Sequence, residues 1–307
     1  MSISRLVCCS MLIVSSWRPM LAEEAPLLWK FSVGDEHHYR MIQNMEMEMT
    51  LGAGERKIET VLQQTLDMTW KIEQVNEQGL ATLIQTVERV RMDMQAPGQP
   101  AMHYDTDSDD PPAGFAAMLV PLFKAMTTEP FRITITPRGE IKTLEVPEAL
   151  SKAMQSTPGA AMMGDMFSDA GFRKMIQQSS LILPEPKDLE PGYEWTTEAE
   201  MKNGQFGQLN AETTYTYLGP REVAEKPLEV FKFALKLEFG EGPGGVQMDV
   251  VDQESNGEIL FSREAGRLAS SKLQQEMEIK ISAAGQDMKQ KMVQTMVFER
   301  IEKNPTD

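Results

Sequence analysis

The sequence predicts a mainly β protein of the α+β class. Its main element is one large, curved antiparallel sheet, resembling half of a barrel, with a few short helices on the concave side. Long runs alternate between apolar and polar residues with a period of two, as strands with one buried face do. Antiparallel sheets show this alternation, whereas parallel sheets covered on both faces are apolar throughout. Several runs reach ten residues or more, and a long twisted sheet with one apolar face curls around what it buries.

The first two strands are expected in residues 39–51 and 62–73. In the first run the apolar phase is interrupted only at Gln43, and Ile42 is an apolar exception in the polar phase. The second run alternates in the same way. The apolar phases consist of Tyr39, Met41, Met45, Met47, Met49 and Leu51, followed by Leu62, Leu66, Met68, Trp70 and Ile72. Each strand should therefore have one buried and one solvated face.

The third strand follows a turn at residues 76–79 and begins near Leu80. Its apolar phase slips between Val87 and Val90, which predicts a β-bulge near Glu88. Later runs at residues 231–239 and 273–281 alternate as cleanly as the first two. They extend the same one-faced sheet into the second half of the chain.

The middle of the chain has a different pattern. Ala113–Met126 is apolar and contains Pro121, while Pro147–Ser156 and Met162–Ser180 have helical spacing, so two or three short helices are expected. A Pro-rich linker follows at residues 183–191. Similar turn and hairpin patterns on both sides suggest two pseudo-repeats, 27–146 and 189–303, joined by the segment 147–188 within a single domain, 23–307.

The first 22 residues have the pattern of a secretory signal peptide. Arg5 precedes an uncharged apolar stretch that is too short to span a bilayer, and Ala22 suits the last position before cleavage. Export to the periplasm or the exterior is therefore expected. Cys8 and Cys9 are the only cysteines and lie within this segment, so a mature chain would have no disulfide and no thiolate ligand.

The mature chain is strongly acidic. Residues 1–22 contain two of the 30 basic residues and none of the 46 acidic ones, which leaves 28 against 46, a net charge of −18. Such a field repels nucleic acid and anionic lipid head groups. No nucleic acid partner is therefore expected. No apolar stretch of the mature chain predicts a transmembrane span, and the oligomeric state is left open.

Three groups of residues resemble an uncharacterised family of exported bacterial proteins that is labelled only as a domain of unknown function. They are Leu28-Trp29-Lys30-Phe31 with Gly34 and Tyr39, Pro191-Gly192-Tyr193-Glu194-Trp195, and Gly257 to Phe261 with Gly266-Arg267-Leu268. The resemblance would cover most of the mature chain. It implies an architecture loosely similar to the half-barrels of periplasmic lipoprotein carriers, and it brings no catalytic residues.

The chain is rich in methionine, with 24 in the full sequence. Clusters at residues 45–49, 92–94 and 162–166 resemble thioether sites for Cu(I), because soft sulfur suits a soft ion. Alternate strand residues lie about 7 Å apart, however, so these methionines are better explained as core. A third interpretation is an adaptable surface for an apolar ligand such as a lipid or an acyl chain. Its expected lining is Met45, Met47, Met49, Leu66, Met68 and Trp70.

Other candidate chemistry is weaker. The acidic run at residues 105–110 alternates like a Ca²⁺ loop but has neither the required Gly nor the terminal Glu, which favours a solvated linker. His37 and His38 are adjacent on a strand, so they point to opposite faces and make a poor metal pair. No metal or other cofactor is expected. The common motifs of hydrolases, metalloproteases and nucleotide-binding proteins are absent from the sequence, so catalytic residues are not expected either.

The sequence therefore predicts a non-catalytic protein of the periplasm or envelope that binds an apolar ligand in a cavity formed by the sheet. One alternative is a structural or protein-interaction module of the envelope with no small ligand. A second alternative is a Met-rich Cu(I)-binding protein.

Overall fold

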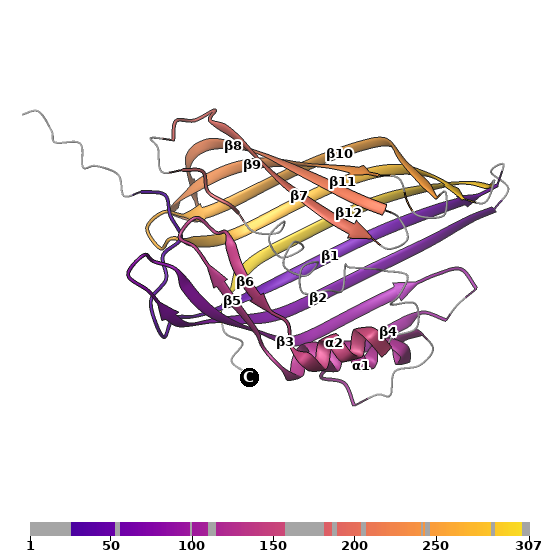
Figure 1. Ribbon diagram of the computed structural model, residues 1–307, viewed down its shortest axis with the longest axis horizontal. Coiled ribbons are helices and arrows are strands. Elements are labelled where there is room, and N and C mark those ends of the chain that lie inside the picture. The colour runs from indigo at the N-terminus through magenta and orange to yellow at the C-terminus, as the bar shows by residue number, and fades with distance from the viewer. Residues whose placement is uncertain are drawn as a thin grey trace, which may run out of the picture.

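The computed structural model describes residues 26–302, apart from 53–55, 99, 110–114, 157–180, 186–188, 204–206, 241, 243–245 and 284–285. Twelve strands form one antiparallel sheet in the order β6-β5-β3-β2-β1-β12-β11-β10-β9-β8-β7, with β4 paired beside β3 (Figure 1). The strands are β1 (Glu36–Leu51), β2 (Arg56–Val75), β3 (Ala81–Gln95), β4 (Met102–Asp105), β5 (Phe131–Ile135), β6 (Ile141–Glu145), β7 (Glu194–Asn203), β8 (Gly207–Val223), β9 (Lys226–Phe239), β10 (Gln247–Ser262), β11 (Arg267–Ala283) and β12 (Gln286–Ile301).

The two halves of the chain meet where the first and the last strand pair. β1 and β12 are in register from His38 opposite Ile301 to Leu51 opposite Met288. β1 to β6 come from the first half and β7 to β12 from the second, so each half supplies a contiguous block of the sheet. The predicted antiparallel, mainly β architecture is confirmed. The division into pseudo-repeats stays a prediction.

Local signals in the sequence account for the turns and the bulge. Asn76 and Leu80 close the turn between β2 and β3, and Gly79 adopts a φ of 77°, which favours glycine. On β3, Arg89 is opposite Asp67 and Val87 is opposite Met68, which leaves Glu88 as the extra residue. The bulge expected near Glu88 is confirmed.

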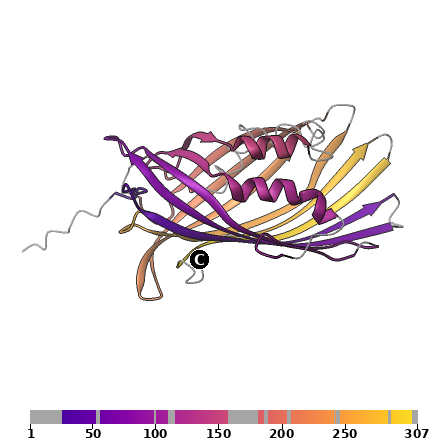
Figure 2. The same ribbon diagram turned by 90° about the horizontal axis from the view of Figure 1, so that it is seen from below.

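Two helices lie on the inner side of the curved sheet, as expected (Figure 2). They are α1 (Phe115–Thr128), which contains Pro121, and α2 (Glu148–Ser156). The ring of Phe123 stacks on Tyr104 of β4 at 4.8 Å between centroids, and Leu150 of α2 is fully buried. The predicted helical segment Met162–Ser180 lies outside the described residues.

The buried apolar residues form three clusters on the inner face. The first lies between β1 to β6 and the helices. The second cluster contains residues of the strands from β8 through β11, which pack against Trp29 and Leu183 outside the sheet. The third occupies the opposite end of β10 and β11 and consists of Met248, Met277, Ile279 and Ile281. The outer face is predominantly polar, as the alternation predicts.

Candidate functional site

The six residues predicted to line a cavity all occupy the inner-face phase of β1 and β2, but they do not form one lining. Leu66 and Met68 are buried in the core that the helices cover, and Trp70 packs against it. Trp70 also lies 4.8 Å from the ring of Tyr39 and donates from Nε1 to Gln85 at 3.1 Å. The remaining three, Met45, Met47 and Met49, are half-buried along β1. Leu66, Met68 and Trp70 thus stabilise the core, and the three methionines extend the inner face beyond it.

A row of three methionines crosses the sheet at this end. Met47 on β1 is opposite Met292 on β12, which is in turn opposite Met277 on β11. Directly opposed residues in an antiparallel sheet have Cβ atoms about 5 Å apart. The sulfur atoms of three methionines in such a row can approach one another, whereas alternate methionines along one strand lie too far apart. Gln290 donates to the sulfur of Met47 at 3.0 Å, so this sulfur already has a polar contact.

Beside this row lies a chain of three glutamines. Gln43 Nε2 donates to Gln294 Oε1 at 3.3 Å, and Gln294 Nε2 donates to Gln275 Oε1 at 2.6 Å. The chain crosses from β1 over β12 to β11, and on β11 it lies between Leu268 of the second apolar cluster and Met277 of the third. Gln275 is only 2% exposed, and within the described part of the chain its Nε2 has no hydrogen-bond partner.

Next to the three glutamines, the backbone pairing between β9 and β10 is incomplete. Backbone pairing extends only from Glu229 opposite Phe261 to Phe233 opposite Gly257. Beyond it, side chains of β10 replace the backbone. Ser255 Oγ accepts from the Leu235 N–H at 3.0 Å, and the Gln253 amide both accepts from Leu237 N at 2.9 Å and donates to Leu237 O at 3.0 Å. Amide and hydroxyl groups therefore satisfy the backbone of β9 where the strands diverge.

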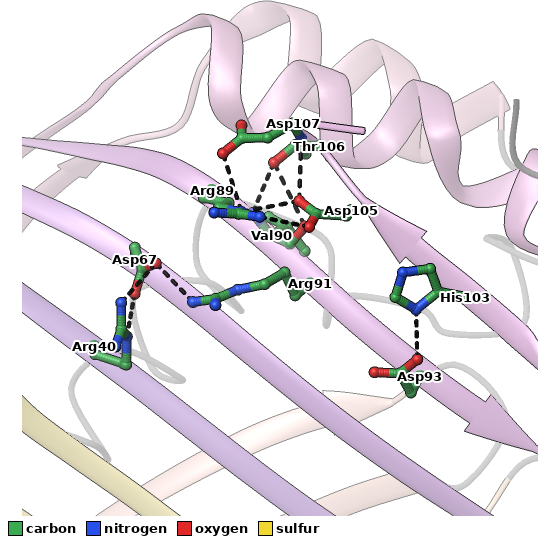
Figure 3. A network of polar contacts seen from close by, with 10 residues as sticks. All are labelled: Arg40, Asp67, Arg89, Val90, Arg91, Asp93, His103, Asp105, Thr106 and Asp107. Carbon is green, nitrogen blue, oxygen red and sulfur yellow. Dashed lines mark hydrogen bonds and ion pairs between the residues drawn. The ribbon is translucent and has the colours of Figure 1, made fainter. Parts of the chain in front are cut away.

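The outer face carries a network of ion pairs (Figure 3). Asp67, which is 9% exposed, accepts hydrogen bonds from Arg40 Nε at 2.5 Å and from Arg91 Nη2 at 2.7 Å. Arg89 forms a bidentate contact with Asp105, at 2.9 Å and 2.6 Å, and also approaches Asp107 at 3.0 Å. These contacts join β1, β2, β3 and β4 on the face opposite the helices. Their role is to fix the strands, because each carboxylate is already taken by a guanidinium.

The acidic run at residues 105–110, which was considered above as a Ca²⁺ loop, contributes to this network of ion pairs. Asp105 and Asp107 face Arg89, and Asp110 lies outside the described residues. Within the described part of the chain, no group of three or more histidine, cysteine, aspartate or glutamate side chains could hold a metal ion.

The contact between Asp105 and Arg89 should make stability depend on pH. The hydrogen bond from Arg89 holds the pKa of Asp105 below its ordinary value of 3.8. A depressed pKa stabilises the fold above the unfolded-state pKa, and this contribution disappears as the pH falls through the folded-state pKa. We expect Asp105→Asn to lose about 1 to 2 kcal/mol near pH 7, as for a charge-assisted hydrogen bond. The deficit should shrink below about pH 3.8 in urea melts.

Asp93→Asn provides the control for this measurement. Asp93 contacts His103 Nδ1 at 2.6 Å on the same face, but both side chains are exposed, at 55% and 69%. Exposed pairs contribute less than about 1 kcal/mol. Equal losses for the two variants, or a deficit of Asp105→Asn that does not shrink as the pH falls below 3.8, would contradict the role assigned to Arg89.

The adjacent histidines have separate partners. His37 Nε2 lies 2.8 Å from Arg267 Nη1, and burial, followed by the Arg267 charge, lowers the pKa of His37. His38 Nδ1 lies 2.8 Å from the hydroxyl of Thr69. That hydroxyl donates to Glu88, the bulge residue, and Thr69 is 8% exposed. A hydroxyl, an imidazole and a carboxylate are thus adjacent, but the proton of Thr69 is directed to a carboxylate in mid-strand, which suits a structural contact.

Part of the chain matches a protein family that has no assigned function. Residues 78–219 match the model of DUF6263, a family of unknown function. No curated protein matches the chain. The match runs from the turn before β3 to within β8 and includes both helices, so it spans parts of both halves of the sheet.

Solved structures resemble the chain only loosely. A lipovitellin structure described by its lipid–protein interactions aligns over 90% of this chain at 11% identity, with a TM-score of 0.47. The chain spans 26% of that lipovitellin chain. DynF from Micromonospora chersina aligns over 93% of this chain and 90% of its own, at 7% identity and a TM-score of 0.23. OpdQ from Pseudomonas aeruginosa aligns over 88% of this chain and 100% of its own, with the same identity and TM-score.

None of the described helices is long and apolar enough to cross a membrane.

Proposed function

We propose that the protein is a non-catalytic binding protein of the periplasm or envelope that holds an apolar ligand against the inner face of its sheet. The observation that supports this is the absence of charge along that face. Inner-face positions between Met41 and Leu51 of β1, Leu273 and Ile281 of β11, and Met288 and Phe298 of β12 carry no charged residue.

The part of this face that suits a ligand lies beyond the helices. Met45, Met47 and Met49 are half-buried there, and Met288 and Met292 of β12 pack partly buried against the third cluster. Methionine is flexible and polarizable, so a methionine-lined surface adapts to apolar molecules of different shape. The curvature of the sheet makes this face concave (Figure 2), which favours ligand contact from several strands at once.

Native mass spectrometry of the protein purified from its own envelope tests this proposal. We expect a lipid-sized mass adduct that disappears when the protein is denatured, since an apolar ligand is held only by the folded sheet. Solvent extraction of the same sample would identify the class of ligand. A bare chain in repeated preparations, together with failure to take up added lipid, would contradict the proposal.

An interaction module remains the alternative from a different class. β7 ends the sheet order and pairs only with β8, so among the described residues its other edge has no strand partner. An open edge of ten residues can accept a strand from another protein. Co-purification of a stoichiometric protein in place of a lipid adduct would favour this function.

The row of Met47, Met292 and Met277 supports a second candidate, a Cu(I) site. Three thioethers suit Cu(I), and the register places them side by side. The same native spectra separate this candidate from the lipid carrier, because a copper adduct is much lighter than a lipid and would be lost in Met292→Leu.

A further inference from the structure

The chain of glutamines on the inner face ends in a donor without an acceptor. Gln275 Oε1 accepts from Gln294 Nε2, and Gln294 Oε1 accepts from Gln43 Nε2, so the relay runs in one direction and leaves the Nε2 of Gln275 at its end. Among the described residues its Nε2 has no hydrogen-bond partner, although Gln275 is only 2% exposed. Buried polar groups are almost always hydrogen-bonded in folded proteins, so an orphaned amide at this place requires an explanation.

The surroundings of Gln275 are apolar along its strand and polar across it. Leu273 and Met277 are the next inner-face residues of β11, and Met277 begins the third apolar cluster. Across the sheet, Gln275 is opposite Gln294 on one side and Ser255 on the other. The hydroxyl oxygen of Ser255 already accepts from the Leu235 N–H. A ligand that inserts between the inner-face side chains along β11 would thus meet apolar contacts next to a buried N–H donor.

The charge of the inner face limits what the donor can receive. No lysine or arginine occupies the inner-face positions from Leu273 to Ile281 or from Met288 to Phe298. The chain as a whole has 46 acidic against 30 basic residues. A free carboxylate or a phosphate would enter this environment without a countercharge, which is strongly unfavourable. The matching acceptor is therefore uncharged.

We propose that Gln275 Nε2 donates to the carbonyl oxygen of a neutral acyl ester, such as a diacylglycerol, whose hydrocarbon chain lies against the third apolar cluster. This inference rests on the proposed function and defines the ligand class more narrowly. The glutamine chain acts as a single unit, because Gln43 and Gln294 orient the amide that contacts the ligand.

A comparison of matched lipids tests this contact. Delipidated full-length mature protein is titrated with dioleoylglycerol, with its dioleyl diether analogue, which lacks the carbonyls, and with oleate, all from nonionic detergent. Occupancy is measured by native mass spectrometry. We expect wild-type protein to bind the diester about 10-fold more tightly than the diether, which corresponds to one hydrogen bond, and to bind oleate anion more weakly than the diester.

Variants assign the preference to one side chain. Gln275→Leu should reduce diester binding to the level of the diether and leave diether binding unchanged. Gln274→Leu is the matched control, since Gln274 is the neighbouring exposed residue on the outer face of the same strand, and it should retain the preference. The wild-type comparison of diester with diether needs no variant, so it tests the proposal even where Gln275→Leu does not fold.

The outcomes distinguish this inference from the proposed function. Equal binding of diester and diether by wild-type protein would overturn the role of Gln275 and leave a lipid-binding protein. A preference that survives in Gln275→Leu, or tighter binding of oleate than of the diester, would also overturn it. Failure to bind any of the three lipids would overturn the proposed function itself.

Discussion

Replacing Glu229 with glutamine is expected to lower the free energy of unfolding by about 3 to 5 kcal/mol, the cost of breaking a buried ion pair. Glu229 is 6% exposed on β9 and accepts from Arg263 Nε at 2.6 Å and from the Tyr217 hydroxyl at 2.5 Å. Burial and this carboxylate raise the pKa of Tyr217 to about 12, so the hydroxyl stays a donor. A neutral amide would leave the Arg263 guanidinium facing an uncharged partner in a largely buried place.

The exposed pair of Arg221 and Glu258 provides the control. This pair is bidentate, at 3.0 Å and 2.8 Å, but its side chains are 48% and 41% exposed. Glu258→Gln should cost less than about 1 kcal/mol. Urea melts of both variants measure the difference, and adding Arg263→Met to Glu229→Gln should recover part of the loss by removing the charge that faces the neutral amide. Equal costs for Glu229→Gln and Glu258→Gln would contradict the importance assigned to burial.

Local periodicity was sufficient to predict β1, β2, β3, β9 and β11 and one irregularity in them. The phase slip between Val87 and Val90 located the bulge at Glu88, because an extra residue inverts the phase of every residue after it. The pairing of β1 with β12 could not be predicted in this way. It joins residues more than 230 positions apart, and no local signal specifies the neighbour of a strand.

The candidate site was predictable only in part. Because apolar residues were chosen by their phase, Leu66 and Met68 were predicted to line the cavity. In the structure both are buried in the core cluster that also contains helix residues. The same criterion passed over Gln275 and Gln294. The available signal was a polar residue in an apolar phase, at Gln43 and again at Gln275, which turned out to be the two ends of the glutamine chain. Its continuation depends on the register of β1, β12 and β11, which sequence alone does not give.

Gly139 occupies the turn that fastens distant segments to the first half of the sheet. It has a φ of 88°, and a Cβ there would lie 2.3 Å from the Leu181 carbonyl oxygen and 2.7 Å from Trp29 Nε1. Trp29 Nε1 donates to that same carbonyl at 3.2 Å. The adjoining turn residues also bind these segments, through Trp29 N to Pro137 O at 2.7 Å and Leu183 N to Arg138 O at 2.8 Å. Because Gly139 has no side chain, the N-terminal segment and the segment at Leu181 can both pack against the turn of the β5–β6 hairpin.

Gly139→Ala is expected to lower the free energy of unfolding by about 3 kcal/mol, which combines a left-handed backbone cost of about 1 kcal/mol with about 2 kcal/mol of overpacking. Gly34→Ala measures the backbone cost alone, because Gly34 also has a positive φ, of 91°, but has nothing within 4 Å of its Cβ position. It should lose only the backbone cost. Denaturation followed by tryptophan fluorescence measures both variants, and the emission of Trp29, buried in wild-type protein, should shift to longer wavelength in native Gly139→Ala alone. Equal losses in the two variants would mean that the Trp29 and Leu181 segments move aside without cost, and that this turn does not fasten them to the first half of the sheet.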